Sequence, residues 1–225
     1  MRELSQGDPS QFHEVRLVSR KWISEEIFEL AFDRPVGFTF SPGQRIRLVH
    51  EKGERDYTPI SSPQDTHLIL LIKVVEGGAL TPVLAEAAVG TSFSFTGPQG
   101  YFVWLPSDRP AVFVATGTGV APFISMARSG VKGFIMVHGV RRRGELHEQS
   151  LLRGAAADYV ACISGPSSGA GPDLFRGRVT TYLRSRLNPG AYDFYLCGQR
   201  DMIRDATLIV DERFAGSSVY AETFY

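Results

Sequence analysis

The sequence changes its pattern near residue 108, and this change constrains the fold more than any other feature. Before it, short segments of alternating or continuous apolar character lie between Gly and Pro turns, at residues 11–19, 27–33, 44–50, 67–75 and 91–96. Such segments predict antiparallel strands, which we expect to form a six-stranded barrel. One alanine-rich helix is expected over residues 80–88.

After residue 108, apolar strands alternate with helices. The predicted strands are 110–115, 131–138, 159–164, 191–197 and 218–222. The predicted helices begin near 121 and span 145–152, 178–187 and 201–210. This alternation predicts a doubly wound parallel sheet. We therefore expect a barrel domain over residues 1–107 and an α/β domain over residues 108–225, which suits a chain of 225 residues.

Charge and cysteine content exclude several classes of protein. Lys plus Arg and Asp plus Glu both number 24, so neither nucleic acid nor a membrane is an expected partner. Residues 1–107 hold 10 basic and 13 acidic residues, and residues 108–225 hold 14 and 11, a net charge of −3 followed by +3. The only cysteines, Cys162 and Cys197, exclude a disulfide framework and an all-cysteine metal site carried by this chain alone. We expect no metal and, since residues 1–8 lack an apolar signal-peptide stretch, a cytoplasmic location.

Two motifs in the first half could bind phosphate. In the extended segment 55–58, Arg55 and Tyr57 share a face, so a guanidinium could grip a diphosphate while the phenol ring lies on a ring system. The Thr58 hydroxyl could reach a ring nitrogen. An ordinary strand end with a surface Arg and a core Tyr explains this segment equally well. The turn at residues 77–81 could hold an anion at a helix start, although Thr81 as a simple N-cap is the commoner explanation.

Three motifs follow in the second half. Residues 116–122 read Thr-Gly-Thr-Gly-Val-Ala-Pro after an apolar strand, so glycines precede a helix start that could bind a pyrophosphate, with Pro122 in the first helical turn. Cys197 ends a buried strand, where α/β sheets bind ligands, although a free cysteine is more often a core residue. The C-terminal residues 220–225 are unusually aromatic, which indicates a docked chain end or simple core packing.

The order of these motifs resembles the ferredoxin–NADP reductase family. The series runs Arg-x-Tyr-Thr (55–58), Gly-Gly-x-Leu-Thr (77–81), Gly-Pro-x-Gly (97–100), Gly-Thr-Gly-x-x-Pro (117–122), Cys-Gly-x-x-x-Met (197–202) and Glu-x-aromatic (222–224). Residues 137–141 and 78–81 look most like its compact bacterial subclass. The resemblance covers residues 10–225 and implies a flavin-binding barrel followed by an NAD(P)-binding domain.

The resemblance also implies a role for each matching residue. Arg55 would hold the FAD pyrophosphate, Tyr57 would stack on the isoalloxazine, and Thr58 would face flavin N5. Further FAD contacts would come from backbone atoms of Ile72, Lys73 and Val74 and from Gly78, Ala79, Leu80 and Thr81. The NAD(P) contacts would come from Thr116, Gly117, Thr118, Gly119, Pro122 and Arg141. Cys197, Gly198 and Met202 would shape the nicotinamide pocket, Glu222 would assist proton or hydride movement, and either Phe224 or Tyr225 would cover the flavin.

The sequence departs from the family pattern after the third strand of the second half. Residues 163–166 read Ile-Ser-Gly-Pro where the compact members have Thr-Arg-Glu, whose Arg grips the 2′-phosphate of NADPH. Ser164, Arg141, Arg142 or Arg176 could replace it, so the choice between NADH and NADPH stays open.

The resemblance implies an FAD-containing oxidoreductase that uses NAD(P)H. It would transfer hydride between NAD(P)H and FAD and single electrons between FAD and ferredoxin, flavodoxin or another separate electron-transfer protein. An alternative is an NADH-dependent reductase component for an oxygenase, and a second is a flavin subunit that never binds nicotinamide. Because 225 residues accommodate the two domains and no fused redox module, we expect the electron partner to be a separate chain. We also expect a monomer.

Overall fold

The structure, a computed structural model, describes residues 11–166, 171 and 173–224. The chain divides into two compact units, Met1–Trp104 (unit 1) and Leu105–Tyr225 (unit 2). Their positions relative to one another are not determined, so each unit is described by itself. The functional domain boundary expected after residue 107 stays a proposal.

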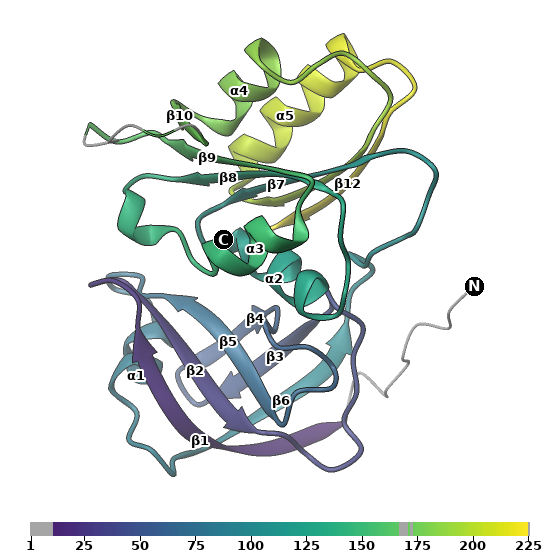
Figure 1. Ribbon diagram of the computed structural model, residues 1–225. Coiled ribbons are helices and arrows are strands. Elements are labelled where there is room, and N and C mark those ends of the chain that lie inside the picture. The colour runs from purple at the N-terminus through teal and green to yellow at the C-terminus, as the bar shows by residue number, and fades with distance from the viewer. Residues whose placement is uncertain (1–10, 167–170, 172, 225) are drawn as a thin grey trace. The chain divides into compact units, whose positions relative to one another are not determined.

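Unit 1 is an antiparallel sheet whose strands run in the order β4-β3-β6-β1-β2-β5 (Figure 1). The strands are β1 (Phe12–Trp22), β2 (Ile27–Asp33), β3 (Arg45–His50), β4 (Gly53–Tyr57), β5 (His67–Lys73) and β6 (Ser92–Gln99). The two edge strands meet beyond the end of β4, where Pro59 bridges Leu70 of β5 and the Ile60 amide donates to the Ile69 carbonyl at 2.8 Å. This contact closes the sheet and confirms the predicted six-stranded antiparallel barrel.

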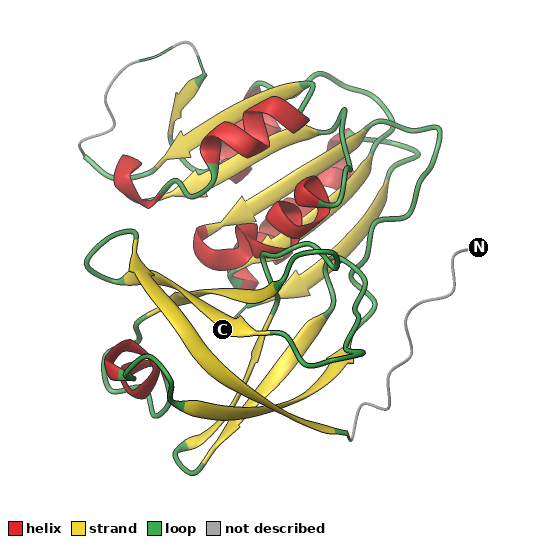
Figure 2. Ribbon diagram, turned by 60° about the horizontal axis from the view of Figure 1, so that its bottom comes forward, coloured by secondary structure: helices red, strands yellow, loops and turns green. Residues whose placement is uncertain are grey.

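The barrel interior is filled by alternate side chains of the strands. Among them Phe28, Phe32 and Phe95 are fully buried. The helix α1 (Thr81–Glu86) is shorter than the predicted 80–88, and it contributes Leu84 to the same core (Figure 2). β4 was predicted only as an extended segment, because its residues are mostly exposed and show no apolar alternation.

Unit 2 is a six-stranded parallel sheet in the order β10-β9-β8-β7-β11-β12. Its strands are β7 (Ala111–Thr116), β8 (Ile135–Val140), β9 (Asp158–Ile163), β10 (Leu174–Arg176), β11 (Asp193–Gly198) and β12 (Ser218–Thr223). Its helices are α2 (Ala121–Arg128), α3 (Gln149–Ala155), α4 (Val179–Ser185) and α5 (Arg200–Arg213). Figure 1 shows α2 and α3 on one face and α4 and α5 on the other, which confirms the predicted doubly wound sheet.

Two local predictions in unit 2 were wrong, and one strand was not predicted. The strand expected over 131–138 begins only at Ile135, because Gly133 turns the chain with φ +81°. The helix expected over 145–152 begins at Gln149, because residues 143–145 form a 3₁₀ turn (η2) and Glu148 adopts a left-handed φ of 50°. The edge strand β10 has three residues and was missed. Within the described ranges, no helix is long and apolar enough to cross a membrane.

Asp193, at the first position of β11, ties the amino end of the sheet to the chain that enters unit 2. Its side chain is 3% exposed, and it accepts hydrogen bonds from Ser107 Oγ and, at 2.8 Å, from Arg109 Nε. Arg109 also donates to the Ser218 hydroxyl at 2.8 Å, so one ion pair joins β7, β11 and β12 at their starts.

We expect Asp193→Asn to lower the free energy of unfolding of unit 2 by about 1–3 kcal/mol, because it weakens hydrogen bonds to a buried carboxylate. Urea unfolding followed by circular dichroism measures the change. Asp201→Asn is the matched control, since Asp201 is 81% exposed and pairs with Arg204 on the surface of α5; its effect should stay below about 0.5 kcal/mol. Equal effects of the two substitutions would contradict this assignment.

Candidate functional site

The strand order of unit 2 reverses between β7 and β11, and α/β sheets bind ligands where their strand order reverses, at the carboxyl ends of the strands. β7 ends at Thr116 and β11 ends at Gly198, with Ala115 paired to Cys197. The predicted motifs 116–122 and 197–202 therefore lie side by side at this edge.

Two glycines let the β7 and β11 turns approach one another closely. A Cβ added to Gly119 would lie 2.5 Å from the Cys197 carbonyl oxygen and 2.7 Å from Cα of Gly198. A Cβ added to Gly198, whose φ is +141°, would lie 2.1 Å from the Thr116 hydroxyl. Both distances are too short for any side chain, so both positions require glycine.

The Thr116 hydroxyl joins the two turns. It accepts a hydrogen bond from the Gln199 amide at 3.2 Å, a contact that the sequence did not indicate. The glycine turn itself forms a 3₁₀ helix, η1 (Gly117–Val120), before α2 begins with Pro122 in its first turn. A Cβ on Gly117 would meet nothing within 4 Å, so the start of this turn has open space beside it.

Cys197 is the penultimate residue of β11 and lies between β7 and β12. It is fully buried and pairs in register with Glu222 of β12, which is 8% exposed. Burial, and then the Glu222 carboxylate, raise the pKa of the Cys197 thiol well above its usual value, so this group is a neutral thiol. Met202 is buried in the core cluster of the same unit.

The chain end is tied to the β11 turn. The Phe224 amide donates to the Gly198 carbonyl at 2.8 Å, which continues the β11–β12 ladder by one residue. Phe224 is half-buried, and Tyr225 lies outside the described residues.

The next two strands, β8 and β9, continue the same edge. The Ser164 hydroxyl donates to the Val140 carbonyl at 3.3 Å, and the Gly165 amide donates to the Arg141 carbonyl at 2.9 Å. The Arg141 amide donates to Glu145 Oε2 at 3.1 Å. Arg141, Arg142 and Arg176 are exposed. Glu145 was not predicted as a candidate binding residue. An acidic residue soon after the second strand of such a sheet is a pattern that could have indicated it.

A second candidate site lies at the end of β4 of unit 1. Thr58 is 2% exposed, and its hydroxyl has no hydrogen-bond partner among the described residues. The same holds for the Tyr57 hydroxyl, and burial raises the pKa of Tyr57 to about 12. Arg55 is exposed on the same face of the strand, and its Nη1 donates to the Glu54 carbonyl at 2.8 Å.

Asp56, on the opposite face of β4, holds this strand against β3. Its carboxylate lies 3.0 Å from Arg45 Nε and 2.7 Å from Arg47 Nε. These ion pairs add side-chain contacts between β4 and β3, which matter because most side chains of β4 are exposed.

In the turn at residues 77–81, the Thr81 side chain bonds back to the end of the preceding segment. Thr81 is the first residue of α1, and its hydroxyl accepts from the Val75 amide at 3.0 Å, so the N-cap explanation was wrong. A Cβ on Gly78 would lie 2.9 Å from the Val75 carbonyl oxygen, which leaves room only for glycine. Ile72 is buried in the barrel core, so its side chain is not available to a ligand, and the backbone contact expected of residues 72–74 stays a prediction.

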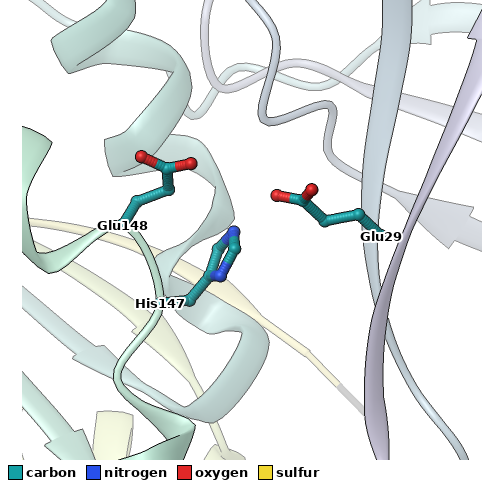
Figure 3. A group of neighbouring side chains, drawn as sticks. All are labelled: Glu29, His147 and Glu148. Atoms are coloured by element: carbon teal, nitrogen blue, oxygen red, sulfur yellow. The ribbon is translucent and has the colours of Figure 1, made fainter. Parts of the chain in front are cut away.

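His138, part of the motif at residues 137–141, is a core residue. It is fully buried, its Nδ1 lies 3.0 Å from the Tyr159 hydroxyl, and burial followed by the nearby His147 lowers its pKa to about 3. Figure 3 draws His147 and Glu148 with Glu29 of β2. Because Glu29 belongs to unit 1, whose position relative to unit 2 is not determined, we assign no metal site to these side chains.

We expect Gly198→Ala to weaken dinucleotide binding at least about tenfold, because the added methyl group pushes the β11 turn away from Thr116. Isothermal titration with NAD⁺ measures the loss. Gly216→Ala is the control, since Gly216 has φ +79° but its added Cβ would lie 3.6 Å from the nearest atom. Unchanged NAD⁺ affinity in folded Gly198→Ala protein would contradict the placement of the site.

Two family models match the chain, one to each unit. An oxidoreductase FAD-binding domain matches residues 14–104, and an oxidoreductase NAD-binding domain matches residues 113–207. Among solved structures, a ferredoxin NADP⁺ reductase from Neisseria gonorrhoeae with bound FAD and NADP has a TM-score of 0.83 at 20% identity, covering 96% of this chain and all of that one. This likeness confirms the fold.

Curated relatives agree with these matches. The toluate 1,2-dioxygenase electron transfer component of Pseudomonas putida is 32% identical over 88% of this chain. The ferredoxin–NADP reductase B of Sorangium cellulosum is 36% identical over 56% of this chain and 54% of its own length. The chain spans 61% of the toluate relative and 62% of a 2-halobenzoate 1,2-dioxygenase component from Burkholderia cepacia. With an FAD-binding domain followed by an NAD-binding domain, the chain belongs to the ferredoxin reductase family.

Proposed function

We propose that this chain passes electrons between NAD(P)H and a separate redox protein by way of a bound FAD. The observation that carries the proposal is the pair of buried hydroxyls on Tyr57 and Thr58, which have no partner within the described residues. A buried hydroxyl without a hydrogen bond costs about 1–3 kcal/mol, so such atoms are expected where a ligand completes the site.

The residues of β4 fit FAD. Arg55 would grip its pyrophosphate, Tyr57 would lie against its ring system, and Thr58 would donate to a ring nitrogen. The tight turn at Gly78 and the backbone of residues 72–74 would complete the site. When bound, FAD supplies hydride acceptance and electron transfer, while the protein supplies binding and orientation.

The unit 2 edge fits the nicotinamide dinucleotide. The backbone amides of Gly117, Thr118 and Gly119 would face the pyrophosphate at the start of α2, where the helix dipole favours negative charge. Cys197 would lie beside the nicotinamide as a neutral thiol, and Gly198 would admit the ring. Glu222, paired in register with Cys197 from β12, would assist proton or hydride movement.

A second candidate is a reductase component of an oxygenase system. The observation in its favour is the likeness to dioxygenase electron transfer components from two bacteria. Both candidates need a separate electron acceptor, either ferredoxin or flavodoxin in the first case or an oxygenase partner in the second. A cytoplasmic location and a monomeric state are part of the proposal.

Anaerobic reduction tests the function. The purified protein should bind FAD, and NADH or NADPH should bleach its visible absorbance. Adding oxidised ferredoxin, flavodoxin or an oxygenase ferredoxin should restore it, and the fastest acceptor separates the two candidates. A folded protein that binds no FAD, or whose flavin neither nucleotide bleaches, would overturn the proposal.

Thr58→Val gives a test that does not depend on turnover. Without FAD, we expect this change to stabilise the protein by about 1 kcal/mol, because it removes an unpaired buried hydroxyl. With FAD, we expect weaker binding, by about fivefold, because a hydrogen bond is lost. Thermal unfolding with and without FAD measures both effects.

Thr66→Val is the control, since Thr66 lies on the surface and its hydroxyl lies 3.0 Å from His67 Nδ1. This substitution should leave FAD affinity unchanged. If wild type and Thr58→Val bind FAD with equal affinity, the assignment of Thr58 to the FAD site is contradicted.

A further inference from the structure

We propose that Glu145 is a specificity-determining residue that favours NADH over NADPH. The inference rests on the proposed function and deepens it, because it assigns the choice between the two nucleotides to one carboxylate. Glu145 has no part in the sequence motifs described above.

The position of Glu145 follows from its contacts. Its Oε2 accepts from the Arg141 amide at 3.1 Å, and Arg141 is the first residue after β8. The carboxylate therefore lies at the carboxyl end of β8. β8 is the neighbour of β7, since Thr116 pairs with Gly139, and adjacent strands lie about 4.8 Å apart. Glu145 is thus one strand away from the glycine turn proposed to hold the pyrophosphate.

The topology decides which half of the dinucleotide passes this carboxylate. β11 and Cys197 lie on one side of β7, and β8 with Glu145 lies on the other. With nicotinamide over β11, the adenosine half must cross the ends of β8 and β9. In doubly wound folds an acidic side chain near this point accepts a hydrogen bond from the adenosine ribose 2′-hydroxyl.

The surrounding contacts fix the carboxylate in place. Its Oε1 lies 3.1 Å from Arg142 Nε, so one guanidinium charge of this loop is already balanced. The Glu145 side chain is 17% exposed, whereas that of Arg142 is 61% exposed. The negative charge is therefore held close to the strand end, while the Arg142 side chain extends into solvent.

The neighbouring strand end leaves little room beside it. A Cβ on Gly165 would lie 2.4 Å from the Arg141 carbonyl oxygen, so β8 and β9 are in contact just past their ends. The Ser164 hydroxyl is turned to the Val140 carbonyl. A 2′-phosphate with up to two negative charges would meet Glu145 here, whereas a 2′-hydroxyl could donate to it.

Glu145→Gln tests this inference. The ratio of the NADP⁺ to the NAD⁺ dissociation constant, measured by calorimetry, should fall about fivefold, since an ion pair interaction at 4 Å in water is worth about 1 kcal/mol. The ratio of kcat/KM for NADPH to that for NADH should rise equally. Both changes should shrink at high ionic strength. Glu145→Asp, which keeps the charge, should retain the wild-type ratios.

Glu212→Gln is the matched control. Glu212 pairs with Arg184 at 2.9 Å, but it lies in the last turn of α5, near the amino ends of the strands. It should leave both ratios unchanged. A ratio that stays constant or moves towards NADH in Glu145→Gln, or that changes equally in Glu212→Gln, would overturn the inference while the proposed function stands. A protein that binds neither NAD⁺ nor NADP⁺ would overturn both.

Discussion

The close contact between the β7 and β11 turns is the constraint on which the α/β unit depends. Gly119 lies against the Cys197 carbonyl, and Gly198 lies against Thr116, so neither turn can move without the other. The Thr116 hydroxyl adds the hydrogen bond to Gln199. Binding loops on many proteins are mobile, but these two are held by the sheet itself. A site built this way is formed before its ligand arrives, which reduces the ordering cost of binding.

The barrel differs, because the strand that carries its candidate site, β4, is short and mostly exposed. β4 has five residues, of which Tyr57 packs against the barrel core, and the ion pairs from Asp56 to Arg45 and Arg47 supplement its ladder with β3. The opposite face is then left for Arg55 and Tyr57. Beyond the strand, the bridge from Pro59 to Leu70 closes the barrel immediately after Thr58. The candidate FAD residues thus lie between two attachments, and their backbone is fixed on both sides.

Most of the fold could be predicted from the sequence, because the barrel strands alternate or are strongly apolar and the second half repeats strand and helix. The failures have physical causes. β4 and β10 are too short or too exposed to show a period, and the start of α3 depends on Glu148, whose left-handed backbone is accompanied by an ion pair to Arg128. The site motifs could be predicted because their glycines and other residues recur at characteristic spacings along the chain. The Thr116–Gln199 hydrogen bond and the Glu145 contacts join residues through the folded sheet, so spacing alone could not predict them.

Net charge, like residue spacing, does not reveal contacts that form only in the folded sheet. The neutral total hides +3 on residues 108–225, a sign that suits a polyanionic dinucleotide. Yet selection between two dinucleotides that differ by one phosphate depends on charges within a Debye length of about 8–10 Å. At the end of β8, Glu145 pairs with Arg142 and contacts the backbone of Arg141, so a carboxylate lies at a strand end of a unit whose net charge is positive. The proposed discrimination by Glu145 thus depends on one side chain, whereas a general attraction of nucleotides follows from composition.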